Sequence, residues 1–85
     1  MKTFNYTIKD ELGIHARPAG LLVKFAGNYQ SEITVVKDGK EANAKRIMAL
    51  MSLGAGKGAE LTIKVEGPDE EEAAKAAEEF LKANL

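Results

Sequence analysis

The sequence contains no cysteine and only one histidine among its 85 residues. Without cysteine it can form neither a disulfide framework nor a thiolate metal site, and one imidazole is too few for a zinc centre. No run approaches the roughly 20 apolar residues that a membrane-spanning helix needs, and the N-terminus has no apolar signal core. We therefore expect a cytoplasmic protein that holds no metal and does not insert into a membrane.

An excess of charge of either sign is also missing. Twelve Lys and Arg residues are balanced by thirteen Asp and Glu residues, which gives a formal net charge of −1. This balance supplies no overall attraction to a polyphosphate backbone, so we expect no nucleic-acid partner.

A chain of this length buries only about 60% of the surface that its unfolded form exposes, which is enough for one core. The sequence predicts a single domain over residues 1–85 with little room for an enclosed active site.

Alternating apolar and polar residues predict the strands. The alternation is present over residues 2–8, 32–37 and 61–65, and it is typical of strands with one buried face. Asp38-Gly39 is a strong hairpin signal, and it predicts that the chain returns through a further strand at residues 40–43.

Apolar residues three and four positions apart predict the helices. One helix begins near Ala16 and stops at Gly27 and Asn28, and a short one covers residues 47–53 before Gly54. A last helix follows Asp69, which is predicted as its N-cap with a glutamate three residues on, and runs to the C-terminus. The order β-α-β-β-α-β-α, with strands apolar on one face only, predicts an α+β open-faced sandwich.

The residues with the clearest chemistry lie at the start of the first helix, in the segment GIHARP at residues 13–18. Pro18 is tolerated in a first helical turn, so the helix begins close to His15, which becomes its N-cap. No neighbouring side chain is a good cap, which leaves the N–H groups of Ala16 and Arg17 free to bind an anion at the positive helix end. The guanidinium of Arg17 adds a group that can bind two phosphate oxygens.

His15 is then a nucleophile beside a phosphate site. The helix dipole and Arg17 disfavour the imidazolium form, so we expect a neutral ring with a lone pair available for attack. The alternative is that His15 is an ordinary surface histidine and Arg17 a solvated charge. The glycine-rich segment at residues 54–59 gives no cofactor site, because it follows a helix and precedes a strand, the reverse of a dinucleotide-binding motif.

The segment GIHARPA at residues 13–19 resembles the active-centre signature of HPr, the histidine phosphocarrier family of the bacterial sugar phosphotransferase system. The segment NAKRIMALMSLG at residues 43–54 resembles the region around that family's short helix, and the element order agrees over essentially the whole chain. The resemblance implies an HPr-like fold, with a four-stranded antiparallel sheet in the order 1-4-2-3 and three helices on one face.

The same resemblance implies a function. The Nδ1 atom of His15 would receive a phosphoryl group from enzyme I, itself charged by phosphoenolpyruvate, and the resulting phosphohistidine would pass it to IIA domains of sugar permeases. Arg17 would be the partner of the phosphate. The chain would be a monomeric carrier that needs no cofactor, rather than an independent enzyme.

The family's docking patch beside the histidine corresponds to Ile47, Met48 and Met51, with Gly20 on the first helix. Apolar residues at helical spacing are more often core, but so short a helix cannot bury every side, so we expect Met48 to be exposed. Gly20 costs roughly 1 kcal/mol relative to alanine inside a helix. It can allow close approach of a partner, although local fraying is the simpler explanation.

One position departs from the family. Many relatives carry a serine directly before the Ile-Met pair, where a kinase phosphorylates it, and this chain has Arg46 there. The sequence therefore predicts that this serine switch is absent. Two alternatives to a carrier are less favoured by the sequence. A regulatory binding module would not need an intact nucleophile, and an independent phosphotransferase would need a nucleotide or metal site.

Overall fold

The computed structural model describes all residues from Met1 to Leu85. The elements follow one another as β1 (Lys2–Thr7), α1 (Ala16–Ala26), β2 (Glu32–Lys37), β3 (Lys40–Asn43), α2 (Ile47–Met51), β4 (Glu60–Glu66) and α3 (Glu70–Asn84). The predicted order of strands and helices is confirmed.

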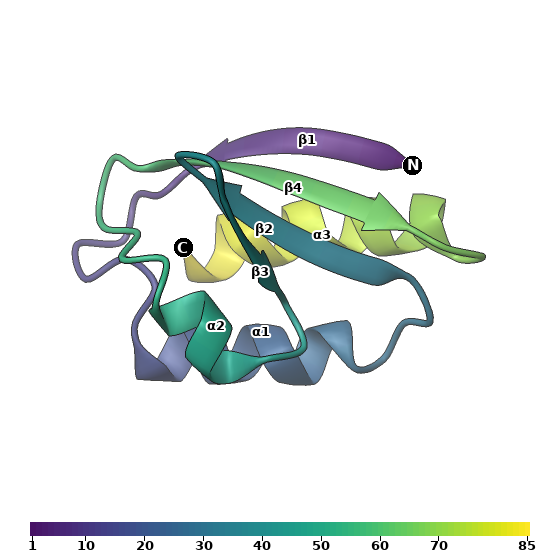
Figure 1. Ribbon diagram of the computed structural model, residues 1–85, viewed down its shortest axis with the longest axis horizontal. Helices are drawn as coiled ribbons and strands as arrows, with labels where there is room; N and C mark the ends of the chain where they lie inside the picture. Colours follow the sequence, from purple (N-terminus) through teal and green to yellow (C-terminus); the bar gives the residue numbers. More distant parts are fainter.

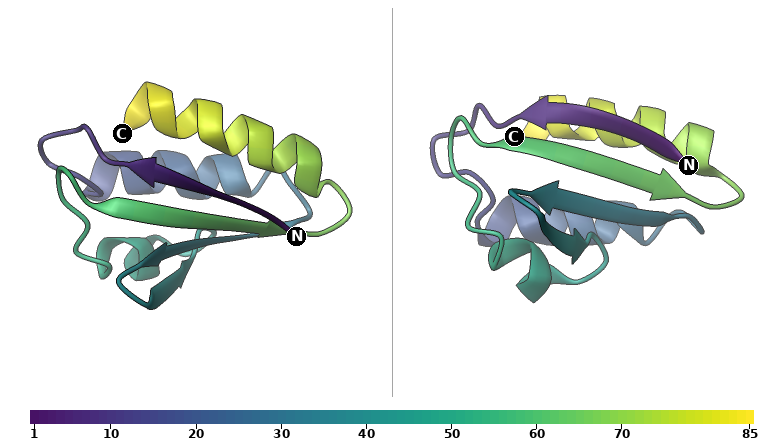
Figure 2. Two further views of the ribbon diagram at one scale, coloured as in Figure 1. Left: turned by 90° about the horizontal axis from the view of Figure 1, so that it is seen from above. Right: turned by 45° about the horizontal axis from the view of Figure 1, so that its top comes forward.

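The strands form one antiparallel sheet in the order β1-β4-β2-β3. β4 is central, since it pairs with β1 on one side and with β2 on the other. Figures 1 and 2 show α1 and α3 side by side on one face of the sheet, with the short α2 next to α1 and close to β3. The predicted α+β architecture with this strand order and three helices is confirmed.

The core lies between the sheet and the two long helices. The inward-facing side chains of β2 and β4 alternate with exposed or half-exposed ones, as the period of two predicts. On the helical side, Phe25 of α1 stacks on Phe80 of α3 with ring centroids 4.9 Å apart, which ties the two helices together. The large side chains buried most completely are Ile8, Ile33, Leu50, Leu61, Ile63, Leu81, Val35 and Val65.

The hairpin between β2 and β3 turns at the predicted Asp38-Gly39 pair. Asp38 has φ of 50° and Gly39 has φ of 80°, as a two-residue type I′ turn requires. The short helix differs from its prediction, because α2 ends at Met51 rather than at residue 53. Beyond it, the Leu53 N–H donates to the Leu50 carbonyl at 3.2 Å, so the chain tightens into a turn of the 3₁₀ type.

The predicted N-cap position of α3 is confirmed, but the predicted capping by the Asp69 side chain is wrong. Asp69 stands at the N-cap position, but its side chain makes no capping hydrogen bond. Its carboxylate instead accepts hydrogen bonds from the Ser31 hydroxyl and N–H and from the Gln30 N–H, 38 or 39 residues earlier in the chain. These bonds, that of the Ser31 hydroxyl above all, lower the pKa of Asp69 below its usual range. Asp69 thus fastens the loop between α1 and β2 to the start of α3.

Candidate functional site

His15 lies where the sequence predicts it, at the N-cap of α1 with an extended backbone (φ −117°, ψ −174°) and no capping bond from its side chain. Its carbonyl accepts the N–H of Ala19 at 3.0 Å, which closes the first turn. Pro18 has no N–H, and those of Ala16 and Arg17 donate to no protein acceptor. The predicted pair of free donors at the positive end of a helix is therefore present.

The loop before His15 is fixed by the segment that follows α2. Ile14 donates its N–H to the Ala55 carbonyl at 2.9 Å. Gly13 has φ of 66°, and a Cβ at that position would lie 2.5 Å from the Gly56 Cα and would overlap the Ala55 carbonyl oxygen. Only glycine permits this approach of two backbones. The position of His15 therefore depends on Gly13 as well as on the helix.

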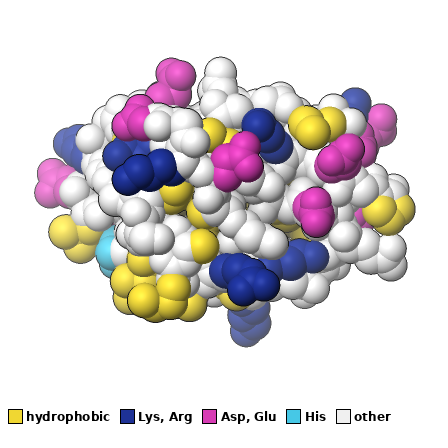
Figure 3. All heavy atoms as spheres, viewed as in Figure 1, with side chains coloured by type: hydrophobic (Ala, Val, Ile, Leu, Met, Phe, Trp, Pro, Cys, Tyr) yellow, Lys and Arg dark blue, Asp and Glu magenta, His cyan; other side chains and the backbone are white.

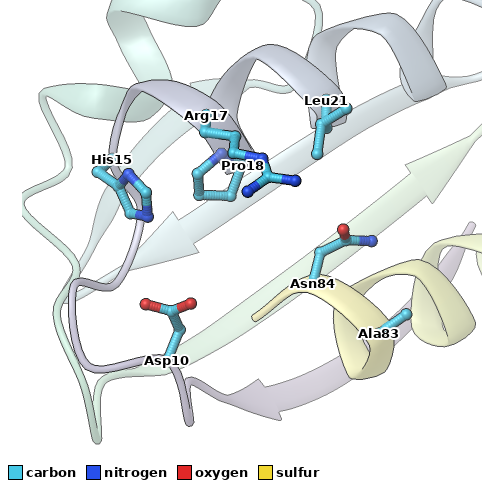
Figure 4. Close-up of a pocket in the computed structure, with 7 residues that line it drawn as sticks. All are labelled: Asp10, His15, Arg17, Pro18, Leu21, Ala83 and Asn84. Atoms are coloured by element: carbon cyan, nitrogen blue, oxygen red, sulfur yellow. The ribbon is translucent and has the colours of Figure 1, made fainter.

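An open cavity of about 250 Å³ lies beside the histidine. It joins the loop before α1, the first turns of α1 and the last residues of α3, as Figure 4 shows. Its lining is formed by Asp10, His15, Arg17, Pro18, Leu21, Ala83 and Asn84.

Arg17 and Asp10 are the charged side chains of this cavity. Arg17 is exposed and forms no hydrogen bond or ion pair with the rest of the chain, and Figure 4 shows its guanidinium at the cavity. A free guanidinium and the open helix end can together bind an anion next to the histidine. No group of three or more His, Cys, Asp or Glu side chains is placed to hold a metal ion.

Asp10, Leu21 and Asn84 line the cavity but were not predicted from the sequence. Asp10 begins an Asp-Glu-Leu-Gly segment, which is a recognisable turn signal, but a turn signal does not show where the carboxylate points. Asn84 reaches the cavity only because the end of α3 packs near the loop before α1, where Leu85 accepts the N–H of Asp10 at 2.8 Å. Such a contact has no local signature.

The short helix presents apolar side chains to solvent. Met48 is 74% exposed, Ile47 39% and Met51 37%, whereas Leu50 faces the core. The predicted exposure of Met48 is thus confirmed. Leu21 of α1 is also exposed, and Figure 3 shows the histidine next to a group of hydrophobic atoms on this side of the molecule. These residues, Leu21, Ile47, Met48 and Met51, are called the apolar face below.

Gly20 lies where α1 meets α2. Helix α1 continues through it without interruption, so the expectation of local fraying is wrong. A Cβ at Gly20 would lie 3.8 Å from the Ile47 Cδ1, which is ordinary contact. Because Gly20 has no side chain, nothing projects from α1 at this point, and the surface beside the apolar face stays open.

Arg46 is the N-cap residue of α2, directly before Ile47. Its side chain is exposed, makes no capping hydrogen bond and forms no ion pair. Together with Arg17 it places two unpaired guanidinium groups at the first residues of the two helices that carry the apolar face.

Comparisons with known proteins agree with these features. Residues 2–83 match the family described as the PTS HPr component phosphorylation site. HPr-C-His from Thermoanaerobacter tengcongensis is 45% identical, with a TM-score of 0.93 over 99% of this chain and 94% of that one. Phosphocarrier protein HPr from Bacillus anthracis str. Ames is 40% identical, with a TM-score of 0.87 over 94% and 95%. An HPr dimer from Thermoanaerobacter tengcongensis is 46% identical, with a TM-score of 0.76 over 98% and 95%. None of the helices combines the length and apolar composition needed to cross a membrane.

Proposed function

This chain belongs to the HPr family of phosphocarriers of the phosphotransferase system, and we propose on that premise that His15 carries the phosphoryl group. The donor is enzyme I, charged by phosphoenolpyruvate, and the acceptors are IIA domains of sugar permeases. The observation that carries the proposal is the placement of the only histidine at an uncapped helix N-terminus, beside an unpaired arginine.

In the proposed step, the lone pair on the Nδ1 atom of His15 attacks the phosphorus atom held by enzyme I. The new P–N bond forms as the bond between the phosphorus atom and enzyme I breaks, and in a second transfer the P–N bond breaks as a IIA domain takes the group. The free N–H groups of Ala16 and Arg17 and the guanidinium of Arg17 bind the phosphoryl oxygens, over which negative charge is spread during transfer. The chain acts as a carrier between two proteins rather than as an independent catalyst.

The apolar face is proposed as the docking surface for both partners, with Gly20 allowing close approach. Its exposed methionines suit a surface that binds more than one partner, since the unbranched thioether side chain adapts its shape. An anionic surface on the partner would also be attracted by Arg17 and Arg46. Enzyme I is charged by phosphoenolpyruvate, so the proposal places the chain in the cytoplasm.

The absence of the family's regulatory serine is part of the proposal. Arg46 has no hydroxyl group, so ATP-dependent phosphorylation before Ile47 is impossible, and its positive charge stays next to the apolar face. A phosphoserine there would instead place negative charge beside that face and repel acidic partners.

Incubation with enzyme I and phosphoenolpyruvate tests the proposal. We expect one phosphoryl group per chain, labile in acid and stable in alkali, and none on His15→Ala. A chain that binds enzyme I but accepts no phosphate would instead be a regulatory binding module.

Because one similar HPr forms a dimer, the monomeric state of this chain stays a prediction, and light scattering during size-exclusion chromatography measures it.

A further inference from the structure

The carboxylate of Asp10 lies in the same cavity as the His15 ring, and Figure 4 shows the two side chains pointing toward each other across it. Asp10 is half-buried and held in place. Its Oδ1 accepts the N–H of Leu12 at 2.8 Å, and its own N–H donates to the main-chain oxygen of Leu85 at 2.8 Å. The second carboxylate oxygen forms no hydrogen bond or ion pair within the chain.

The other polar side chains in the cavity are weaker acceptors for the histidine or cannot accept at all. Arg17, from α1, offers donors only. The amide nitrogen of Asn84, from α3, donates to the Phe80 carbonyl at 2.9 Å, which leaves its Oδ1 as a neutral acceptor, weaker than a carboxylate oxygen. Asp10 is the only acidic side chain in the lining, so its free oxygen is the strongest acceptor facing the ring.

We propose that Asp10 is a positioning residue for His15: one bridging water accepts the Nε2–H of the ring and donates to the free oxygen of Asp10. The two side chains form no direct hydrogen bond, and a cavity of about 250 Å³ has room for a water molecule between them. The hydrogen bond made by one imidazole nitrogen fixes which nitrogen carries the proton. With the proton on Nε2, the lone pair is on Nδ1, the nitrogen that attacks in the proposed function on which this inference rests.

The same arrangement assists the transfer itself. When the Nδ1–P bond forms and the bond between the phosphorus atom and enzyme I breaks, the ring gains positive charge while Nε2 keeps its proton. A carboxylate on the Nε2 side opposes that charge, whereas Arg17 acts on the phosphoryl oxygens. The two charged side chains thus have separate tasks, one on the ring and one on the phosphoryl group.

The test compares three substitutions by nitrogen-15 NMR of the imidazole, at about pH 9, well above the range in which histidines ordinarily titrate. Asp10→Asn keeps an oxygen for the Leu12 N–H but turns an NH₂ donor toward the cavity, and Asp10→Ser keeps only the turn acceptor. Asp38→Asn, at the hairpin, is the matched control for the loss of one exposed charge. We expect the wild type and Asp38→Asn to carry the proton on Nε2, Asp10→Ser to show a mixture, and Asp10→Asn to favour Nδ1–H.

Phosphoryl transfer from enzyme I is the second readout. Loss of a charge-assisted contact of this kind slows transfer by about tenfold in Asp10→Asn, with an unchanged melting temperature. An unchanged tautomer in Asp10→Asn would overturn the inference, and so would a shift confined to the Arg17 guanidinium resonances. If the wild type accepts no phosphate, the proposed function fails while the tautomer measurement still decides the role of Asp10.

Discussion

Replacement of Gly13 by alanine tests how the fold places the histidine. In this structure Gly13 has φ of 66°, and the added Cβ would overlap the Ala55 carbonyl oxygen and lie 2.5 Å from the Gly56 Cα. Both neighbours are backbone atoms, so no side chain can rotate away. The loop before His15 must move, and the hydrogen bond between the Ile14 N–H and the Ala55 carbonyl, 2.9 Å long, is lost.

The expected loss of stability has two parts. An alanine in the left-handed conformation costs about 1–2 kcal/mol, and the broken hydrogen bond adds about 1 kcal/mol. At 4–8 °C per kcal/mol for a domain of this size, the melting temperature of Gly13→Ala falls by roughly 10–25 °C. The overlap itself adds to this figure wherever the loop cannot relax completely.

Gly54→Ala is the matched control. Gly54 has φ of 64°, almost the same as Gly13, but a Cβ there would meet nothing within 4 Å. Gly54→Ala therefore loses only the free energy of placing an alanine in the left-handed conformation. Its melting temperature falls by roughly 4–16 °C, less than that of Gly13→Ala. Thermal unfolding followed by circular dichroism measures both. Equal losses in the two variants would refute the claim that close backbone approach at Gly13 fixes the loop.

Four further predictions concern single side chains. Arg17→Ala slows phosphoryl transfer by about tenfold to a hundredfold while the affinity for enzyme I changes little, because the guanidinium acts on the phosphoryl oxygens during transfer and not on the docking surface. Rapid-quench kinetics measure the transfer rate and calorimetry the affinity. Met48→Glu weakens binding of enzyme I by about tenfold or more at nearly unchanged melting temperature, whereas a large thermal loss with unaltered affinity would show a core role. Arg46→Ser becomes a substrate of the family's serine kinase with ATP, whereas serine phosphate on the wild type would contradict the predicted absence of this switch. The same variant associates more slowly with enzyme I at low salt, and equal association rates would contradict the attraction assigned to Arg46. Asp69→Asn is less stable than the wild type at neutral pH. Because folding lowers the pKa of Asp69 below its ordinary value near 3.8, this difference is complete above about pH 5 and shrinks as the pH falls through the folded pKa, which urea unfolding at several pH values measures.

The order and type of the helices and strands could be predicted from the sequence because the signals for them are local. Alternation along the strands, the Asp38-Gly39 turn and Pro18 in the first turn of α1 each depend on residues within one element or its ends. Asp69 shows where this reasoning fails. It has the right residue type at the N-cap position, but the Ser31 and Gln30 donors approach from a distant loop and take its carboxylate.

In the candidate site, too, local features could be predicted and features that depend on distant contacts could not. His15, Ala16 and Arg17 are adjacent in sequence, so the free N–H groups and the arginine beside the histidine could be predicted. The cavity could not, because its other wall is formed by Asp10 and the end of α3. Gly20 could be identified as unusual, but its role at the contact with Ile47 emerges only when α1 and α2 pack together.

The central claim is that His15 takes a phosphoryl group from one protein and delivers it to another. Intact-mass spectrometry of a single turnover tests it most directly, with the isolated phosphorylated chain mixed with a IIA domain after enzyme I and phosphoenolpyruvate have been removed. We predict that the mass of one phosphoryl group, located on His15 by fragmentation, leaves this chain and appears on the IIA domain. A phosphoryl group located on another residue, or one that stays on this chain while the IIA domain remains unmodified, would contradict the account.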